Sequence, residues 1–400
     1  MILDIDPFGT ATIAICVFFL GGAIVNRSKP LRDYSIPESV VGGFICAIAL
    51  ALLYSISDIE VRFDIYRRDL FLAYFFSALG LLSNVRDIAA YRRPLAVIVI
   101  LASVFILIQN TAGMAIASAF GHHPKLGIVA GSMALTGRSG TSVAWAPLFE
   151  QRFGLENLSR LGVGANMLGL IAACCLGGPV AKFLVRRHRL TSPGQSANLH
   201  VGISRDARSP QLDYRAFLLA LLRIHLAIVL GQLLDLGLSA AGARLPLYVS
   251  CLAAGIVLGN VLNRVAPTLN SPGSDQCLSL IADVSLGLFY TMTLMSMQLW
   301  SIQGGMLIFL LVMIVLQALL AVAYACTVVY RIMGRDYEAA VLSAGFVGMS
   351  LGSTATTMAI MTAVAKQYGR AQKAFIIVPL ACGFFMDIIN SLAISFFAAL

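Results

Sequence analysis

Residues 304–330 read GGMLIFLLVMIVLQALLAVAYACTVVY, and none of these side chains carries a charge. A helix needs roughly 20 apolar residues to cross the hydrocarbon core of a bilayer, so this run is long enough to span one. Residues 95–120 and 372–398 form comparable runs, in which Lys373 and Asp387 are the charged side chains. Within lipid, only helices and closed barrels satisfy their own backbone hydrogen bonds. The runs are continuous rather than alternating, which indicates helices.

The composition of the whole chain agrees with this interpretation. Of 400 residues, 59% are hydrophobic and 12% are charged, whereas soluble domains are about half apolar and about a quarter charged. We attribute the net charge of +9 to lysines and arginines in cytoplasmic loops, not to a nucleic-acid partner. The eight cysteines lie mostly in apolar stretches without metal-ligand spacing, so neither disulfides nor a bound metal cofactor is expected.

Ten apolar runs separated by polar breaks predict ten transmembrane helices in an all-α integral membrane protein. Their approximate bounds are 10–25, 36–54, 70–83, 95–119, 161–184, 216–240, 246–262, 281–298, 304–330 and 372–397. The first seven residues hold two aspartates and no basic residue. A signal peptide begins with basic residues, so the first run is expected to remain as a span.

Two further apolar stretches, about 126–149 and about 338–364, are rich in Gly, Ser and Thr and are interrupted near the middle. The first contains TGRSGTS at 136–142, and the second contains GMSLGSTATT at 348–357. Glycine favours irregular backbone, and hydroxyl groups can satisfy the backbone groups that a broken helix leaves free. We therefore predict that each stretch is a re-entrant hairpin, which enters the membrane and returns to the same side.

The two predicted hairpins correspond to each other along the sequence. The matched positions are Gly137 with Gly352, Thr141 with Thr356 and Phe153-Gly154 with Tyr368-Gly369, all 215 apart, and Pro37 with Pro246, which are 209 apart. The chain therefore reads as two repeated halves, residues 1–185 and 216–400, joined by a basic cytoplasmic linker at 186–215. Five spans per half is an odd number, so the second half is expected to have inverted topology, as in many secondary transporters.

The distribution of basic residues predicts the orientation. If both termini lie outside, nineteen lysines and arginines fall in cytoplasmic segments and seven in outside segments, and Arg138 and Arg223 lie within apolar stretches. This bias follows the positive-inside rule. The first hairpin then enters from outside and the second from the cytoplasm.

Several stretches resemble the bacterial sodium/glutamate symporter family. They are YSIPE at 34–38, GG at 42–43, QN at 109–110, the first hairpin through AW at 144–145, LGGPVA at 176–181, GRDY at 334–337, AAVL at 339–342, VP at 378–379 and FMDIIN at 385–390. The resemblance covers the chain from the second span to its end. It implies ten spans, two re-entrant loops and a homodimer in the bacterial inner membrane. It also implies sodium-coupled symport of glutamate or a related acidic amino acid, by elevator-like movement of a transport domain against a dimer scaffold.

The chain departs from the family pattern at both hairpin tips. The first tip in the family usually reads Ser-Gly-Gly-His-Gly-Thr, whereas residues 136–141 carry Arg138 and Ser139 in place of the second Gly and the His. The second tip usually reads Gly-Ala-Thr-Pro-Thr with an Asn soon after, whereas residues 352–356 read GSTAT and Ile360 stands in place of the Asn. A dicarboxylate or another organic anion, coupled to sodium or protons, therefore stays an alternative substrate.

Both tips offer the donors that an anionic substrate needs in a site without water. Helix N-termini bind anions through free N–H groups, and hydroxyls can bind a carboxylate, an ammonium group or sodium. The candidate substrate-binding residues are Thr136, Gly137, Arg138, Ser139, Gly140, Thr141, Ser142, Gly352, Ser353, Thr354 and Thr356. The structural alternative is that these small residues only pack against neighbouring helices.

Arg138 and Asp387 are charged residues within predicted membrane segments. Arg138 has three possible roles: its planar fork binds a substrate carboxylate, it fills the cation position of the site, or it pairs with a protein acid or reaches the outer surface. Asp387 and Asn390 share one helix face because they are three positions apart. With Asn110, they are candidate ligands of a coupling sodium ion; a carboxylate alone could carry a proton, and a packing hydrogen bond is the structural alternative.

Other classes of membrane protein find less support. No HExxH and no phosphate-binding GxxxxGK[ST] motif occurs, which argues against a zinc hydrolase and against ATP-driven transport. A channel is distinguished from a carrier by the absence of saturable turnover in liposomes. The sequence thus favours a secondary transporter that is not an enzyme, whose partners are lipid and a small anion and whose only coupling factor is sodium.

Overall fold

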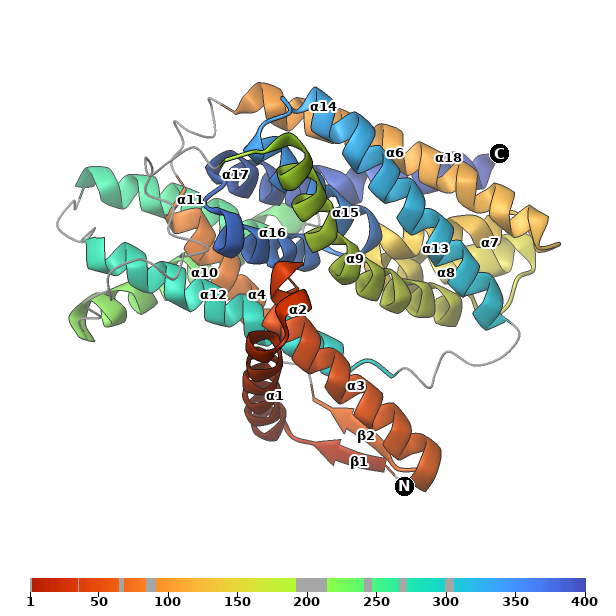
Figure 1. The fold of residues 1–400 in the computed structure, drawn as a ribbon, viewed down its shortest axis with the longest axis horizontal. Helices are drawn as coiled ribbons and strands as arrows, with labels where there is room; N and C mark the ends of the chain where they lie inside the picture. The colour runs from red at the N-terminus through yellow and green to blue at the C-terminus, as the bar shows by residue number, and fades with distance from the viewer. Residues whose placement is uncertain are drawn as a thin grey trace.

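The computed structural model describes residues 2–34, 36–64, 68–83, 91–191, 214–240, 247–265, 272–298 and 306–400, and most of them are helical (Figure 1). Each of the ten predicted spans overlaps a helix. Among these described residues, seven helices are long and apolar enough to cross a membrane, and a pair bent by 45° would make an eighth. The chain is therefore a multi-span helical membrane protein. Most of the predicted linker, residues 192–213, lies outside the described residues.

The first half of the chain contains α1 (Pro7–Arg27), α2 (Lys29–Asp33), α3 (Glu38–Ser57), α4 (Arg68–Leu81), α6 (Arg92–Ala119), α7 (Lys125–Ile128), the π-helical turn η1 (Val129–Met133), α8 (Arg138–Phe153) and α9 (Leu158–His188). The second half contains α10 (Tyr214–Ala240), α11 (Leu247–Val265), α12 (Pro272–Met295), α13 (Met306–Tyr324), η4 (Ala325–Val329), α14 (Tyr330–Ile332), α15 (Tyr337–Leu351), α16 (Thr354–Tyr368), α17 (Gln372–Leu380), η5 (Ala381–Met386) and α18 (Asp387–Ala399).

The helices form two groups. Helices α1, α3, α4, α10, α11 and α12 pack on one another and are called the α4 group here. Helices α6–α9 and α13–α18 form the hairpin group, because it contains both interrupted segments. In Figure 1, the two groups lie next to each other, with α4 and α10–α12 on the left and α6, α8, α9 and α13 on the right. Each group draws helices from both halves of the chain.

Small residues let helices of the α4 group cross closely. A Cβ on Gly42 in α3 would lie 2.2 Å from the carbonyl oxygen of Val17 in α1. A Cβ on Gly231 in α10 would lie 2.8 Å from the Cα of Cys251 in α11. Gly42 and Cys251 are 209 positions apart, which is also the spacing of Pro37 and Pro246. The crossing of the first two spans thus recurs in the second half, as a repeat predicts.

Two short strands were not expected from an all-α assignment. β1 (Ile2–Ile5) and β2 (Glu60–Phe63) pair in parallel, with Ile2 opposite Glu60. Each strand has four residues at the polar edge of a span, which is too short for a period-two pattern to be detected. The pairing holds the start of α1 beside the end of α3, so both ends lie on one side of the molecule.

The crossing of α4 with α11 generates a stability prediction. A Cβ on Gly80 would lie 2.4 Å from the carbonyl oxygen of Leu252 and 3.0 Å from the Cα of Gly255. We expect Gly80→Leu to destabilise the protein by about 1–3 kcal/mol, because the two backbones must separate. The readout is the midpoint of thermal unfolding in detergent. Gly237→Leu in α10 is the matched control, because a Cβ at Gly237 has no neighbour within 4 Å; equal losses in both variants would contradict the packing argument.

Candidate functional site

The second interrupted segment folds back on itself. Helices α15 and α16 pack together, and each has 15 residues, or about 22 Å. That length is less than the roughly 30 Å of the hydrocarbon core. At the ends of the segment, the Tyr337 hydroxyl donates to the Gly369 carbonyl, and the Glu338 carboxylate accepts from the N–H groups of Lys373 and Ala374 at 3.2 and 3.0 Å. The chain therefore leaves this segment where it entered.

The first interrupted segment also returns to its start. Its entering arm is α7 with η1, and its returning arm is α8. Lys125 Nζ lies 5.4 Å from the centroid of the Phe153 ring, so the first residue of α7 is beside the last residue of α8. The returning arms of the two segments end in the same way, at Gly154 with φ 63° and at Gly369 with φ 113°. These two glycines are the matched pair that the repeat predicts.

The two segments enter from opposite ends of one bent helix. Lys125 Nζ donates to the carbonyl of Phe397 at 2.6 Å, near the end of α18. Glu338 in turn binds the first turn of α17. Helices α17 and α18 follow each other through η5 and are bent by 45°. One interrupted segment is therefore held beside the start of this helix pair, and the other beside its end.

The tips of the two hairpins meet between these entrances. Gln109 of α6 joins them, because its Nε2 donates to the Ser350 carbonyl at 3.0 Å and its Oε1 accepts from the Thr136 hydroxyl at 2.9 Å. Thr136 Oγ1 also lies 3.5 Å from the Ser350 carbonyl oxygen. A Cβ on Gly169 of α9 would touch both Leu135 and Leu351. These contacts bring the two tips together.

Buried amide side chains support the backbone of the first tip. Gly131 departs from helical geometry, which frees peptide groups that need partners. Asn110 Oδ1 accepts from the N–H of Ser132 at 3.3 Å, and Asn390 Nδ2 donates to the Ser132 carbonyl at 3.1 Å. Asn166 Nδ2 donates to the Ala134 carbonyl at 3.0 Å. The side chains of Asn110 and Asn390, both predicted cation ligands, are therefore hydrogen-bonded to the backbone of the same residue, Ser132.

Several buried oxygens around this segment have no hydrogen-bond partner among the described residues. They are Ser132 Oγ, Asn390 Oδ1 and Gln317 Oε1. Ser132 is fully buried and Asn390 is 1% exposed. Unpaired buried polar atoms call for an explanation such as an ion or water, and hard cations prefer neutral and anionic oxygen ligands. We call Ser132, Asn390, Asn110 and Gln317 the oxygen cluster.

Arg138, a predicted substrate ligand, and Asp387, a predicted cation ligand, form an ion pair. Arg138 Nη2 lies 2.8 Å from each carboxylate oxygen of Asp387, and its Nη1 donates to the Tyr248 hydroxyl at 2.8 Å. Asp387 begins α18 directly after η5, the π-helical stretch that interrupts the last span. Their side chains are 24% and 33% exposed, so the pair is not sealed off. π-Helical interruptions of this kind are frequent at functional sites.

Residues from both tips line one cavity of about 10 Å³, which has room for about one water molecule. It is bounded by Thr136 and Arg138 from the first hairpin and by Met349 and Thr354 from the second, with Asp387 and two other residues of the last span, Cys382 and Met386. The returning arms α8 and α16 both begin at this point. Their N-terminal N–H groups and helix dipoles favour a negative charge here.

The remaining predicted hydroxyls are held by local hydrogen bonds. Thr141 and Ser142 donate to the carbonyls of Gly137 and Arg138 one turn back. Ser353 accepts from the N–H of Thr356 and so caps α16. Gly137 is needed because a Cβ there would lie 2.5 Å from Asn390 Nδ2, and Gly352 forms the tip of the second hairpin. Gly140 is open to its surroundings, and the side chain of Ser139 lies outside the described part.

A serine-hydrolase-like pattern, Gly348-x-Ser350-x-Gly352, occurs at the second tip and deserves comparison with an enzyme site. The Ser350 hydroxyl donates to the Val347 carbonyl at 3.2 Å, as a helix-interior serine does. Ser350 is 2% exposed. Its local geometry is therefore that of a packed helix residue.

Two tyrosines that sequence reasoning missed connect the α4 group to the tips. Tyr248 of α11 binds Arg138, and Tyr290 of α12 donates to Thr356 Oγ1 at 3.0 Å. The Tyr290 hydroxyl also lies 2.8 Å from Cys174 Sγ of α9. Their partners are more than 60 positions away along the chain, so no local pattern marks them. Each hairpin tip thus has one hydroxyl contact to the α4 group.

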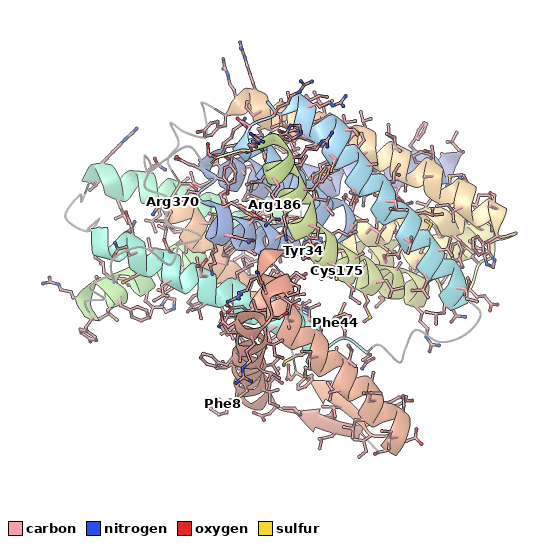
Figure 2. The ribbon with its side chains drawn as sticks, in the orientation of Figure 1. Phe8, Tyr34, Phe44, Cys175, Arg186 and Arg370 are labelled. Atoms are coloured by element: carbon pink, nitrogen blue, oxygen red, sulfur yellow. The ribbon has the colours of Figure 1, made fainter. Side chains whose placement is uncertain are left out.

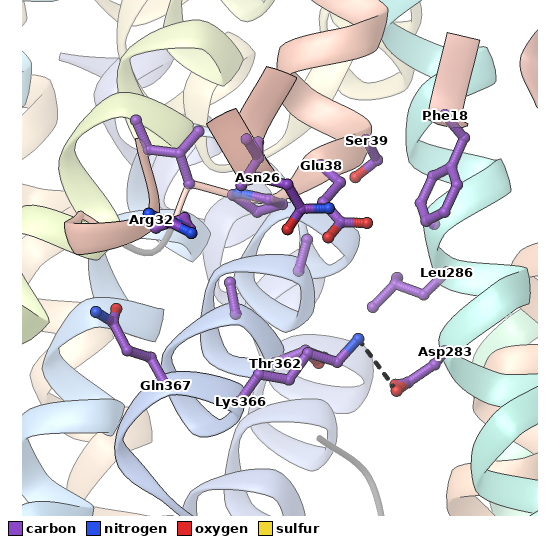
Figure 3. A pocket seen from close by; sticks show the side chains of 16 residues that line it. Phe18, Asn26, Arg32, Glu38, Ser39, Asp283, Leu286, Thr362, Lys366 and Gln367 are labelled. Atoms are coloured by element: carbon purple, nitrogen blue, oxygen red, sulfur yellow. Dashed lines mark ion pairs between the residues drawn. The ribbon is translucent and has the colours of Figure 1, made fainter. Parts of the chain in front are cut away.

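A larger cavity of about 370 Å³ lies between α16 and the α4 group. Figure 3 shows Glu38 and Ser39 on one side and Thr362 and Lys366 on the other, with Lys366 directed at Asp283. Lys366 Nζ is 3.2 Å from Asp283 Oδ2. The volume of this cavity lies within the range of small-molecule sites, about 300–1,000 Å³.

The contacts between α12 and α16 show how this cavity relates to the tips. Asp283 and Lys366 join the two helices at one position, and Tyr290 and Thr356 join them at another, nearer the tip. The cavity lining ends at Ala359 on α16, one turn from Thr356. The Tyr290–Thr356 hydrogen bond therefore lies between the lining of this cavity and the second hairpin tip.

The ends of the helices divide between two sides. The His188 ring at the end of α9 lies 5.0 Å from the Tyr330 ring of α14. In Figure 2, Arg186 and Arg370 are labelled in the upper half of the view, and Phe8, near the start of α1, is labelled well below them. Basic residues that the sequence assigns to the cytoplasm are thus distant from the N-terminal end.

Comparison with known proteins agrees with this architecture. The family model "Sodium/glutamate symporter" matches residues 3–370. A sodium/glutamate symporter of Haemophilus influenzae is 33% identical over 389 residues, which cover 96% of this chain and 95% of that protein. One from Escherichia coli is 32% identical over 405 residues, which cover 99% and 98%. A solved sodium proton antiporter from Methanocaldococcus jannaschii aligns over 98% of this chain and 96% of its own at 14% identity, with a TM-score of 0.39, which is too low to establish a shared fold. The chain belongs to the sodium/glutamate symporter family.

Proposed function

We propose that this protein carries glutamate or a related acidic amino acid across the bacterial inner membrane together with sodium. The observation that carries this proposal is the convergence of both hairpin tips on one cavity, where two helix N-termini meet Thr136 and Thr354. Such a site favours an anion. Sodium/glutamate symport is what the names of the two bacterial relatives state of those proteins.

The proposed layout is ten spans and two re-entrant hairpins in two inverted halves, residues 1–185 and 216–400. It places both termini outside and the linker at 186–215 in the cytoplasm. The opposite entrances of the two hairpins support this layout. The homodimer that the family resemblance implies stays a prediction.

The substrate site of this proposal lies at the two tips, which separate to admit the ligand because the cavity between them has room for about one water molecule. Carboxylates of the substrate bind N–H groups where α8 and α16 begin, and Thr354 lines the same space. The hydroxyls of Ser353 and Thr356 exchange partners with the ligand, because each hydroxyl both donates and accepts. Gly140 is open to its surroundings, and Gly137 and Gly352 leave room for the close packing of the two tips.

The sodium site of this proposal is the oxygen cluster. Ser132 Oγ and Asn390 Oδ1 are buried without partners among the described residues. The backbone of Ser132 is hydrogen-bonded to the side chains of both Asn110 and Asn390. Sodium bound here lies against the backbone of the first tip. Binding of the ion and the shape of the substrate site are thereby linked through one segment of chain.

Movement in this proposal is a displacement of the hairpin group against the α4 group. Both tips belong to the hairpin group, and their polar contacts to the other group are made by Tyr248 and Tyr290. A moving hairpin group exchanges these two contacts, and the ion pair between Lys366 of α16 and Asp283 of α12, for others. The cavity of Figure 3 is then the passage between the site and the cytoplasm.

The function is tested by uptake of labelled glutamate into proteoliposomes under an inward sodium gradient. We expect saturable uptake that disappears when potassium replaces sodium, because sodium binding completes the site. Succinate is the matched probe for the alternative, since it has two carboxylates and no ammonium group. Succinate uptake without glutamate uptake would establish the dicarboxylate alternative, and uptake indifferent to sodium would exclude sodium coupling.

The sodium site is tested with Asn390→Ala, which removes an unpaired oxygen of the cluster. We expect the apparent sodium affinity to fall by about tenfold or more, the range for a polar contact with a charged ligand. Glutamate affinity at saturating sodium should change little. The matched control is Asn166→Ala, which loses a comparable amide bond to the same hairpin but no oxygen of the cluster. Equal effects of the two variants would remove the oxygen cluster as the sodium site.

The passage and the orientation are tested together by cysteine labelling. Ala363 lines the cavity, and Glu156 is exposed in the turn between α8 and α9. We expect an impermeant thiol reagent to label Ala363→Cys from the cytoplasmic face and Glu156→Cys from the outside, above the background of the eight native cysteines. The reverse pattern would invert the topology, and equal labelling of Ala363→Cys from both faces would reject the passage.

A further inference from the structure

The backbone at Arg138 is unusual for a residue with a side chain. Its φ is 70°, which lies in the left-handed region that glycine adopts readily and other residues adopt at a cost. An unfavourable conformation that persists at a functional site indicates that the side chain has a use there.

The side chain of Arg138 is already committed to protein partners. Nη2 contacts both oxygens of Asp387, and Nη1 binds Tyr248. Arginine grips a carboxylate through a pair of nitrogens, and both available pairs, Nη1 with Nη2 and Nε with Nη2, include the engaged Nη2. A substrate carboxylate therefore cannot bind Arg138 through two free nitrogens in this conformation.

Asp387 is placed where a mobile cation would otherwise be attracted. It lies one helical turn before Asn390, whose unpaired oxygen belongs to the oxygen cluster. It also lines the cavity shared by the two tips. A carboxylate in a membrane interior needs a positive partner. Arg138 supplies that charge from within the chain.

We propose that the Arg138 guanidinium is a tethered cation that permanently fills one cation position, at Asp387, so that this transporter couples one sodium ion fewer than it would with glycine there. The proposal rests on the proposed function and concerns the ion count of the same site. The oxygen cluster still binds a sodium ion. Only the position at Asp387 is withdrawn from ion exchange.

The central experiment compares wild-type protein with Arg138→Gly in proteoliposomes, at zero membrane potential and a tenfold sodium gradient. Each coupled sodium ion multiplies the limiting glutamate accumulation by the gradient, so we expect the variant to reach about tenfold higher accumulation. Its sodium dependence should also become steeper. In Arg138→Gly combined with Asp387→Asn, the additional sodium should be lost again, because the carboxylate that holds it is gone.

Arg223→Gln is the matched control for removing a buried arginine. Arg223 is 3% exposed in α10 and contacts Ser274 and Asp275, away from both tips. We expect this variant to couple the same number of sodium ions to each glutamate as wild type does. If Arg138→Gly is poorly folded, Arg138→Gln is measured in the same way, since it also removes the charge.

A measurement without substrate separates this proposal from the proposed function. Sodium should raise the thermal midpoint of purified Arg138→Gly more than that of wild type, because one more ion binds the folded state. This difference is expected even if glutamate is not the substrate. Unchanged sodium response in the charge-removing variants overturns the proposal. Loss of glutamate affinity with an unchanged ion count overturns it as well, and assigns Arg138 to the substrate instead.

Discussion

The structure depends on satisfying the backbone of two helix breaks that lie away from water. A peptide group without a partner in such surroundings costs several kcal/mol. At the first tip, the breaks are satisfied by amides from three other helices, through Asn110, Asn166 and Asn390. Gln109 then ties that tip to the second one. The hairpins can therefore end close together only because these buried amides surround them.

The bent helix pair α17–α18 contacts the entrances of both hairpins. Its first turn binds the entrance of the second hairpin through Glu338, and its last turn binds the entrance of the first through Lys125. Between them, Asp387 and Asn390 reach the tip of the first hairpin. A shift of this span is therefore felt at both entrances and at the site. This connection gives a physical reason for treating the hairpin group as one moving unit.

The sequence was sufficient for features that a local pattern encodes. Continuous apolar runs predicted the helices, and the matched Gly, Ser and Thr clusters located both tips, at Gly137 and Gly352. Spacing also placed Asp387 and Asn390 on one face. The supporting contacts were not predictable, because Gln109 meets Ser350 across 241 positions and Arg138 meets Asp387 across 249. Their pairing depends on how the two halves pack, which no single segment records.

Electrostatics joins the proposed substrate site to the proposed sodium site. The Arg138–Asp387 pair has no net charge, and the oxygen cluster consists of neutral groups. Moving one elementary charge across a membrane potential of 100 mV involves about 2.3 kcal/mol. An acidic amino acid has a net charge of −1 at neutral pH, and one bound sodium ion cancels it. A site whose own charges are balanced therefore moves with little net charge both when loaded with these two ligands and when empty. With glycine at position 138, Asp387 would be neutralised only while a second sodium ion is bound. The arginine at the tip therefore lowers the electrical work of the empty step.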